Sequence, residues 1–166
     1  INSIFDLLDL KDKMPRADQP SPIDRKTPFW LELKDVEFSY PHAQGRNLDK
    51  ISLQLPQGKM VALVGANGSG KTSLIKLICR LYDPARGTLL LNGTDIRDLD
   101  INAYREQIGV VFQDYIRYQA KASDNIRYGD ILRPFNEQAM RRAARSAGAD
   151  GFIEQLADGY ESMLGT

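Results

Sequence analysis

The sequence has few of the features that mark secreted or membrane-spanning chains. It contains one cysteine, Cys79, so no internal disulfide can form, and the apolar stretch around it indicates a buried, reduced thiol in a cytosolic environment. No apolar run approaches the ~18 residues that a membrane-spanning helix needs, and no signal-peptide pattern is present. The 22 basic and 22 acidic residues balance, so no bulk charge favours binding to nucleic acid or to an anionic membrane.

The length and the N-terminal stretch indicate a segment of a longer polypeptide. A chain of 166 residues fits one domain, or a piece of a somewhat larger domain, and it begins at Ile1 rather than at a methionine. Residues 1–13 have the periodicity of a short amphipathic helix, and the prolines of residues 15–28 predict an extended linker. Two interpretations stay open here: a frayed terminus, or the end of a preceding domain with its tether.

The most informative stretch is a glycine-rich turn with a lysine, Gly65-Ala66-Asn67-Gly68-Ser69-Gly70-Lys71-Thr72. An apolar run precedes this turn, and an apolar helical stretch follows it as far as Tyr82. The pattern is G-x-x-x-x-G-K-[ST] in its strand–loop–helix setting. Glycines let the main-chain amides turn inward, and a helix N-terminus beside them binds anionic phosphates. We expect Lys71 to neutralise β- and γ-phosphate oxygens and the Thr72 hydroxyl to bind Mg²⁺.

The remaining periodicities predict a mixed α/β fold. Alternating apolar residues predict strands at residues 29–40, with a slip near Asp35, and at residues 51–55, which together form a small antiparallel sheet. Continuous apolar runs predict buried parallel strands at Met60–Val64 and Ile108–Phe112. The other expected elements are a strand at 87–92 and helices at 70–82, 100–106 capped by Asp100, 124–128 capped by Asp124, 136–147 capped by Asn136, and 149–156.

With these residues in view, the chain resembles the nucleotide-binding domain of ATP-binding-cassette transporters of the exporter type, from about Trp30 to Thr166. Tyr40, in V-E-F-S-Y-P, resembles the A-loop aromatic residue that stacks on adenine, a task suited to a ring face. The alternative is a tyrosine that only packs at the end of a strand. Gln113, in V-V-F-Q-D, resembles the Q-loop glutamine, which in the family reaches Mg²⁺ and the attacking water.

The resemblance implies a fold, a set of ligands and a set of partners. The fold is α/β, a P-loop NTPase (RecA-like) core with an antiparallel β subdomain and the beginning of a helical subdomain, incomplete in this chain. ATP and Mg²⁺ would be bound by Tyr40, residues 65–72 and Ser73, with Lys71 and Gln113 as catalytic residues and Thr72 and Gln113 as metal ligands. The partners would be a second nucleotide-binding domain, identical or paralogous, and the transmembrane domain of the same polypeptide.

The resemblance also implies a place in the cell and a division of the chain. The place is the cytoplasmic face of the inner membrane, with no nucleic acid bound. Residues 1–28 would be a helix end and a proline-rich linker from a preceding transmembrane domain. Residues 29–122 would form the nucleotide-binding core, and residues 123–166 would begin the helical subdomain.

Several motifs of that family are absent from these residues. They are the signature motif L-S-G-G-Q, the Walker B strand ending in Asp-Glu, the D-loop and the switch histidine. The only histidine, His42, comes too early, and neither Asp95 nor Asp114 stands beside a glutamate that could polarise water. We therefore expect these residues alone to bind nucleotide without hydrolysing it. We also expect the two buried-type strands to expose apolar edges where the strands of the absent stretch would pair.

Two other functions stay open on the motif alone: a small-molecule kinase, and a P-loop ATPase that does not transport. The spacing of Tyr40 and Gln113 argues against the kinase, and the absence of N-K-x-D argues against guanine recognition. The charge balance argues against an ATPase that acts on nucleic acid. Arg141, Arg142 and Arg145 follow one side of an amphipathic helix, which is typical of a solvated face.

Overall fold

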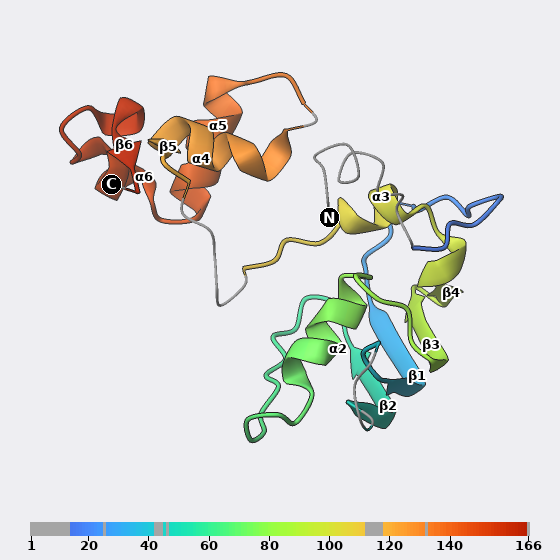
Figure 1. The fold of residues 1–166 in the computed structure, drawn as a ribbon. Coiled ribbons are helices and arrows are strands. Elements are labelled where there is room, and N and C mark those ends of the chain that lie inside the picture. The colour runs from blue at the N-terminus through green and yellow to red at the C-terminus, as the bar shows by residue number, and fades with distance from the viewer. Residues whose placement is uncertain are drawn as a thin grey trace, which may run out of the picture. The chain divides into compact units, whose positions relative to one another are not determined.

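The chain folds into two compact units, which divide between Gly109 and Val110 (Figure 1). This computed structural model describes residues 14–24, 26–41, 45, 47–111, 118–131 and 133–165. The helix predicted in residues 1–13, His42, Asp114 and Gln113 lie outside the described residues. The domain boundaries predicted after residues 28 and 122 stay predictions. None of the helices in the described part of the chain has the length and apolar content needed to cross a bilayer.

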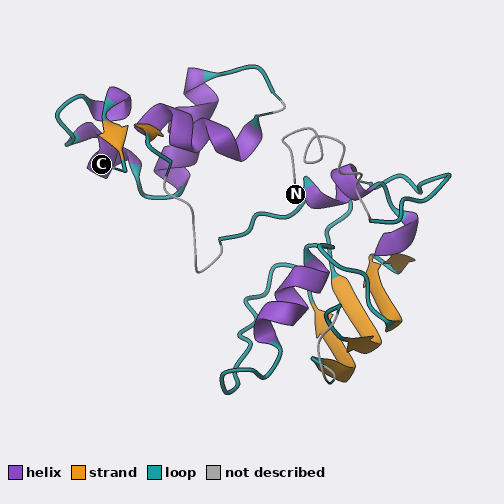
Figure 2. Cartoon of the chain, viewed as in Figure 1, coloured by secondary structure: helices purple, strands orange, loops and turns teal. Residues whose placement is uncertain are grey.

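A four-stranded antiparallel sheet organises the first unit (Figure 2). Its strands lie in the order β2-β1-β3-β4, so β1 pairs with a neighbour on each side. The predicted slip near Asp35 is confirmed, because both ladders of β1 shift register there and Asp35 has a left-handed φ of 46°. The strands are β1 Leu31–Phe38, β2 Leu48–Leu55, β3 Arg86–Leu91 and β4 Thr94–Asp95.

One helix, α2 (Lys71–Ile78), packs into the same core as this sheet. Leu74 and Leu77 of the helix are buried with Leu33 and Val36 of β1 and Leu89 of β3, and the last four of these residues are at most 1% exposed. Such burial is the main source of stability for a helix this short, which would not persist alone in water. The helix after the glycine-rich turn is therefore held by the antiparallel sheet.

The C-terminal end of α2 is capped by side chains from α3 (Ile101–Arg105), which follows the short helix η1 (Ile96–Asp98). Tyr104 donates its hydroxyl to the Ile78 carbonyl at 2.6 Å, and Arg105 donates to the Arg80 carbonyl at 2.7 Å. Burial raises the pKa of the Tyr104 phenol, which keeps the donated proton in place. The last carbonyls of a helix have no partner within it, so these side chains satisfy them.

Two caps were predicted correctly in the sequence, and one helix ends earlier than predicted. Asp100 accepts from the Ala103 amide at 2.7 Å and caps α3. Asn136 caps α5 (Glu137–Ser146) through the Ala139 amide at 2.9 Å. The helix α2 ends at Ile78 rather than at Tyr82, because Arg80 has a left-handed φ of 49° that an α-helix cannot continue.

The two parallel strands predicted from continuous apolar runs are not formed. Residues 60–64 and 108–111 make no strand ladder, and Met60, Val64 and Val111 are 100%, 93% and 92% exposed. A parallel strand is held by hydrogen bonds to its neighbours, and neither segment pairs with a strand in the described ranges. Most of these apolar side chains are exposed, although Ile108 packs against the core, and the segments do not have strand structure.

The second unit consists of short helices around a small core. Ala122, Met140, Ala144, Ile153 and Tyr160 form this core. Gly148, at a left-handed φ of 69°, ends α5 as predicted. The elements are β5 Ala120–Lys121, α4 Ala122–Arg127, η2 Tyr128–Asp130, α5 Glu137–Ser146, α6 Asp150–Glu154, η3 Gly159–Glu161 and β6 Met163–Leu164.

The structure tests two further predictions: Asp124 as a helix cap, and Cys79 as a buried thiol. Asp124 is not a helix cap, because α4 already begins at Ala122 and Asp124 lies inside its first turn. Cys79 is 7% exposed, and burial raises the pKa of its thiol. The prediction of a buried thiol is therefore confirmed.

The first prediction concerns Asp95, which precedes η1 and accepts from the Arg97 amide and guanidinium at 2.9 and 2.7 Å. Burial by itself would raise its pKa, but the bonds from Arg97 outweigh burial and hold the pKa below its ordinary value. A lowered folded-state pKa gives stability that is present above the unfolded pKa of about 4 and is lost as the pH falls through the folded pKa. Asp95→Asn should lower the free energy of unfolding by about 1 kcal/mol at pH 7.

Urea unfolding at pH 7 and pH 3 checks this prediction, with the exposed Asp98→Asn as the control. The deficit of Asp95→Asn should shrink at pH 3, because the wild-type carboxylate loses its advantage once it is protonated. An equal deficit at both pH values would show that the charge of Asp95 contributes nothing.

Candidate functional site

The glycine-rich turn at residues 65–70 leads directly into the first turn of α2 in the structure. Residues 65–69 are exposed, and the helix begins where the Leu74 amide donates to the Gly70 carbonyl at 2.9 Å. Gly70 is the N-cap of α2 and offers no side chain to the first-turn amides. Amides at a helix start have no partner within the helix, and together with the helix dipole they attract anions.

Backbone geometry explains two of the glycines in this turn. Gly70 has a φ of 91°, and a Cβ there would lie 2.6 Å from Leu48 Cδ2 and 2.7 Å from the Asn47 carbonyl oxygen. Gly68 has a φ of 82° but open space around it. Gly70 is therefore required both by conformation and by the close approach of β2, whereas Gly68 is required by conformation alone.

The Lys71 ammonium bonds to the turn that precedes it. Its Nζ donates to the carbonyls of Gly65 and Ala66 at 2.7 Å each and lies 3.3 Å from the Ser69 hydroxyl. An ammonium carries three donor hydrogens, and these three acceptors match that number. The structure thus places the positive charge of Lys71 at the turn, where the sequence predicts phosphate oxygens to bind.

Tyr40 is brought to the same helix, although it lies far from the turn in the sequence. Its hydroxyl accepts a hydrogen bond from Ser73 Oγ at 3.2 Å, and Lys76 Nζ lies 5.3 Å from its ring centroid. The half-buried ring also packs edge-on against Phe38 and Tyr82, with centroids 4.9 and 5.2 Å away. Tyr40 therefore packs in the core and also lies beside the first two turns of α2, a position that suits both core packing and contact with a base.

Asn47 connects Tyr40 to the glycine-rich turn, and sequence reasoning missed it. Its side-chain oxygen accepts from the Tyr40 amide at 3.1 Å, and its amide donates to the Phe38 carbonyl at 2.8 Å. Its own carbonyl oxygen lies where a Cβ on Gly70 would clash. The only available signal was its place at the end of a polar hairpin loop, which does not reveal that it meets Gly70.

The other predicted ligands fall into two groups. Thr72 is exposed in the first turn of α2, whereas Ser73 is 6% exposed and bonded to Tyr40. Gln113 lies outside the described residues, so its predicted place beside the turn stays a prediction. In the described part of the chain, no three His, Cys, Asp or Glu side chains gather in a group that could hold a metal ion.

Comparison with known proteins decides which family carries this arrangement. The family model described as ABC transporter matches residues 48–164. The chain belongs to the ABC transporter family. Over 166 residues it is 36% identical to ABC transporter B family member 29, chloroplastic, of Arabidopsis thaliana, with 99% of this chain and 26% of that protein covered. Over 165 residues it is 40% identical to an ATP-dependent lipid A-core flippase of Methylococcus capsulatus, with 99% and 27% covered.

The fold of this ABC transporter chain is that of a solved exporter. A bacterial Atm1-family ABC exporter matches it with a TM-score of 0.83 and 28% sequence identity, over 97% of this chain and 28% of that one. The predicted family and the predicted P-loop NTPase fold are therefore confirmed. The chain spans about a quarter of the length of the relatives that it matches.

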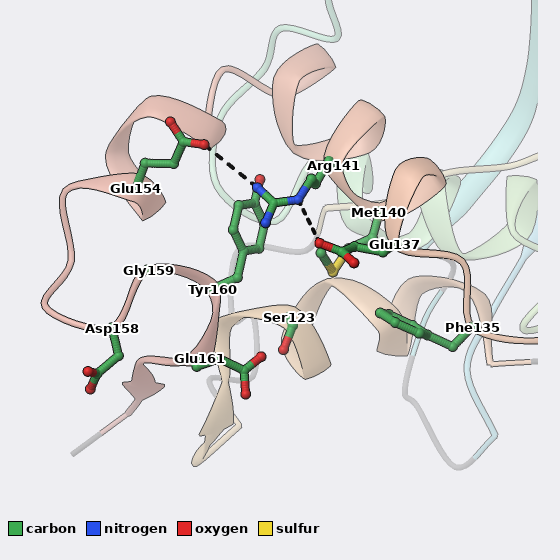
Figure 3. Close-up of a pocket in the computed structure, with 10 residues that line it drawn as sticks. All are labelled: Ser123, Phe135, Glu137, Met140, Arg141, Glu154, Asp158, Gly159, Tyr160 and Glu161. Atoms are coloured by element: carbon green, nitrogen blue, oxygen red, sulfur yellow. Dashed lines mark hydrogen bonds and ion pairs between the residues drawn. The ribbon is translucent and has the colours of Figure 1, made fainter.

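A separate cavity of about 700 Å³ lies in the second unit of the ABC transporter chain (Figure 3). Four carboxylates line it, from Glu137, Glu154, Asp158 and Glu161. Arg141 lies among them over the Tyr160 ring, 4.5 Å from the centroid, and pairs with Glu137 at 3.0 Å and Glu154 at 3.6 Å. None of the predicted nucleotide ligands lines this cavity, so its size does not mark the phosphate site.

Tyr160, which lines that cavity, is also tied to the start of α6. Its hydroxyl donates to Asp150, whose other oxygen accepts from Arg145 at 3.1 Å. The bond from Tyr160 and then that from Arg145 hold the pKa of Asp150 below its ordinary value, and the same bond to Asp150 raises the pKa of Tyr160. These contacts join α5, α6 and η3, and they explain the cavity wall as part of the packing of the second unit.

The second prediction compares Gly68 and Gly70, the two glycines of the turn that have a left-handed φ. Gly70→Ala should lower the free energy of unfolding by about 1–3 kcal/mol more than Gly68→Ala, because only Gly70 adds overpacking against Leu48 and Asn47 to the backbone strain. Thermal or urea unfolding of the two variants measures the difference. Equal losses would mean that the turn does not pack against the start of β2.

Proposed function

We propose that this chain is the nucleotide-binding part of an ABC exporter, which binds ATP with Mg²⁺ and, in the complete protein, hydrolyses ATP to power export. The observation that carries the proposal is the meeting of three parts at one helix. The glycine-rich turn leads into α2, Lys71 bonds to the turn, and Tyr40 lies against the first two turns of α2. A triphosphate and a planar base need such a pair of sites, one for anionic oxygens and one for a ring.

The site residues divide the work by chemistry. In the proposal, amides of residues 65–73 bind the phosphate oxygens, and the Lys71 ammonium exchanges one or more of its bonds to Gly65, Ala66 and Ser69 for bonds to β- and γ-phosphate oxygens. The phosphate oxygens carry full charge, whereas the carbonyl oxygens that they replace do not. The exchange is therefore favourable for the cation.

Mg²⁺ fits the residues present at the start of α2. Mg²⁺ prefers oxygen ligands and keeps several waters, so one exposed hydroxyl beside substrate phosphates is a sufficient protein contribution. Thr72 offers that hydroxyl, and the carbonyl of Gln113 is the second proposed ligand. When bound, Mg²⁺ neutralises charge on the phosphate oxygens. In the proposal, Thr72 and Gln113 hold the Mg²⁺ ion in position beside the phosphates.

The partners and the location follow from the family and remain proposals. A second nucleotide-binding domain, identical or paralogous, would complete the site, and the transmembrane domain of the same polypeptide would receive its movement at the cytoplasmic face of the inner membrane. The relatives named as exporters and flippases support this arrangement. Membership of the ABC transporter family also argues against the small-molecule kinase that the motif alone left open.

The third prediction tests the phosphate site through its charge. Lys71→Ala in the full-length protein should raise the Kd for ATP by about a hundredfold, which is the loss of about 3 kcal/mol expected for a charged hydrogen bond. Lys59→Ala, at an exposed lysine outside the turn, is the matched control. Equilibrium binding of a fluorescent ATP analogue measures both variants, and an unchanged Kd for Lys71→Ala would contradict the phosphate assignment.

The fourth prediction tests the base site. Tyr40→Ala should weaken ATP binding by about 1–3 kcal/mol, the scale of base–aromatic stacking, and should leave inorganic triphosphate binding unchanged. Tyr40→Phe keeps the ring and loses only the bond from Ser73, so it should retain most of the affinity. Competition binding with ATP and triphosphate measures this. Parallel losses for both ligands in Tyr40→Ala would indicate that Tyr40 only packs.

A further inference from the structure

Arg80 is a buried cation directly after α2. It is 1% exposed, and its Nη1 donates to the carbonyls of Ile96 and Leu99 at 2.8 and 3.3 Å. Its Nη2 donates to the Pro15 carbonyl at 3.0 Å, and its Nε pairs with Asp83 at 3.3 Å. A buried charge is costly unless it is fully bonded, and the rigid fork of arginine suits several carbonyls at once. Arg80 therefore joins three segments that are far apart in the sequence.

The segment that contains Pro15 is also bound at its other end. The Ser21 amide donates to the Asp98 carbonyl at 2.8 Å, and Ser21 forms a parallel bridge with Leu99. We call residues 14–21 the strap. The strap contacts Arg80 near its beginning and the turn at residues 98–99 at its end. The proline-rich stretch in this part is therefore attached to the domain surface, although it forms no helix or ladder.

We propose that the strap joins the chain that precedes Met14 mechanically to the C-terminal end of α2, with Arg80 as its anchor. The glycine-rich turn directly precedes the N-terminal end of α2. The eight-residue helix that separates this turn from Arg80 is a rigid rod of roughly 12 Å. A displacement of the preceding chain is then passed from Pro15 through Arg80 to the end of α2. It reaches β1, which begins at Leu31, only further along the chain. Arg80 acts as a positioning residue in this scheme, and the scheme goes beyond the proposed nucleotide function.

Amide exchange in the nucleotide-free full-length protein tests the anchor. The Ser21 amide should exchange at least about tenfold more slowly than in an unstructured peptide. Arg80→Lys has no fork to hold Pro15 and the turn together, so it should speed exchange of the Ser21 amide by about tenfold and leave β1 protected. Exchange of wild-type Ser21 at the peptide rate, or no change in Arg80→Lys, would overturn the proposal.

Ser21→Pro keeps the test decisive if Arg80→Lys does not fold. This surface change removes the amide that bonds Asp98 and leaves the buried charge intact. It should release the strap without lowering the melting temperature, and faster tryptic cleavage after the exposed Arg16 detects that release. Gln19→Pro, at an exposed position in the strap, should leave the Ser21 amide protected. A wild-type rate of cleavage after Arg16 in Ser21→Pro would show that the bridge at Ser21 does not hold the strap.

A second measurement asks which path carries the movement. A short Gly-Ser insertion between Thr27 and Pro28 lengthens the path to β1 without changing the strap, and it should leave ATP turnover of the reconstituted protein within about twofold of wild type. Ser21→Pro should lower kcat about fivefold with an unchanged Kd for ATP. The reverse pattern would overturn the proposal. Loss of ATP binding in every protein, wild type included, would instead contradict the nucleotide function and leave the exchange result standing.

Discussion

The burial of α2 against the antiparallel sheet is the contact on which the rest of the first unit depends. Leu74 and Leu77 bury one side of the helix, and both helix ends are fixed by other segments. The start is fixed where Gly70 meets the beginning of β2. The end is fixed where Tyr104 and Arg105 bond its carbonyls. A glycine-rich turn that is exposed to solvent can keep a defined position only because the helix that follows it is held in this way.

The antiparallel sheet also explains how a tyrosine 25 residues before the turn reaches the same helix. β1 ends at Phe38, and the hairpin that follows returns at Asn47, whose side chain bonds the Tyr40 amide. Tyr40 therefore stands between the sheet and α2. The same residues that pack the core present one edge of the proposed base site, so packing and binding share side chains here.

Local patterns in the sequence predicted the local elements well. Alternation predicted β1 and residues 51–55 of β2, and an apolar run at residues 87–92 predicted β3. The slip at Asp35 predicted the irregular ladder, and Asp100 and Asn136 predicted the starts of two helices. These features depend on a residue and its near neighbours. The parallel strands at residues 60–64 and 108–111 were predicted from apolar runs, yet strand structure requires a partner that the runs do not specify. Arg80 and Asn47 were missed for a similar reason, since their partners are remote.

By itself the sequence determined the groups that the proposed phosphate site offers, because G-x-x-x-x-G-K-[ST] fixes the turn, the cation and the hydroxyl within eight neighbouring residues. It also predicted the three longer antiparallel strands and the starts of α3 and α5, because periodicity and caps act over one or two turns of chain. Only the tertiary structure decided that Lys71 bonds to its own turn, that Ser73 bonds Tyr40, and that Arg80 binds the strap. Those contacts join segments up to 65 residues apart, and no local pattern encodes the distance between them.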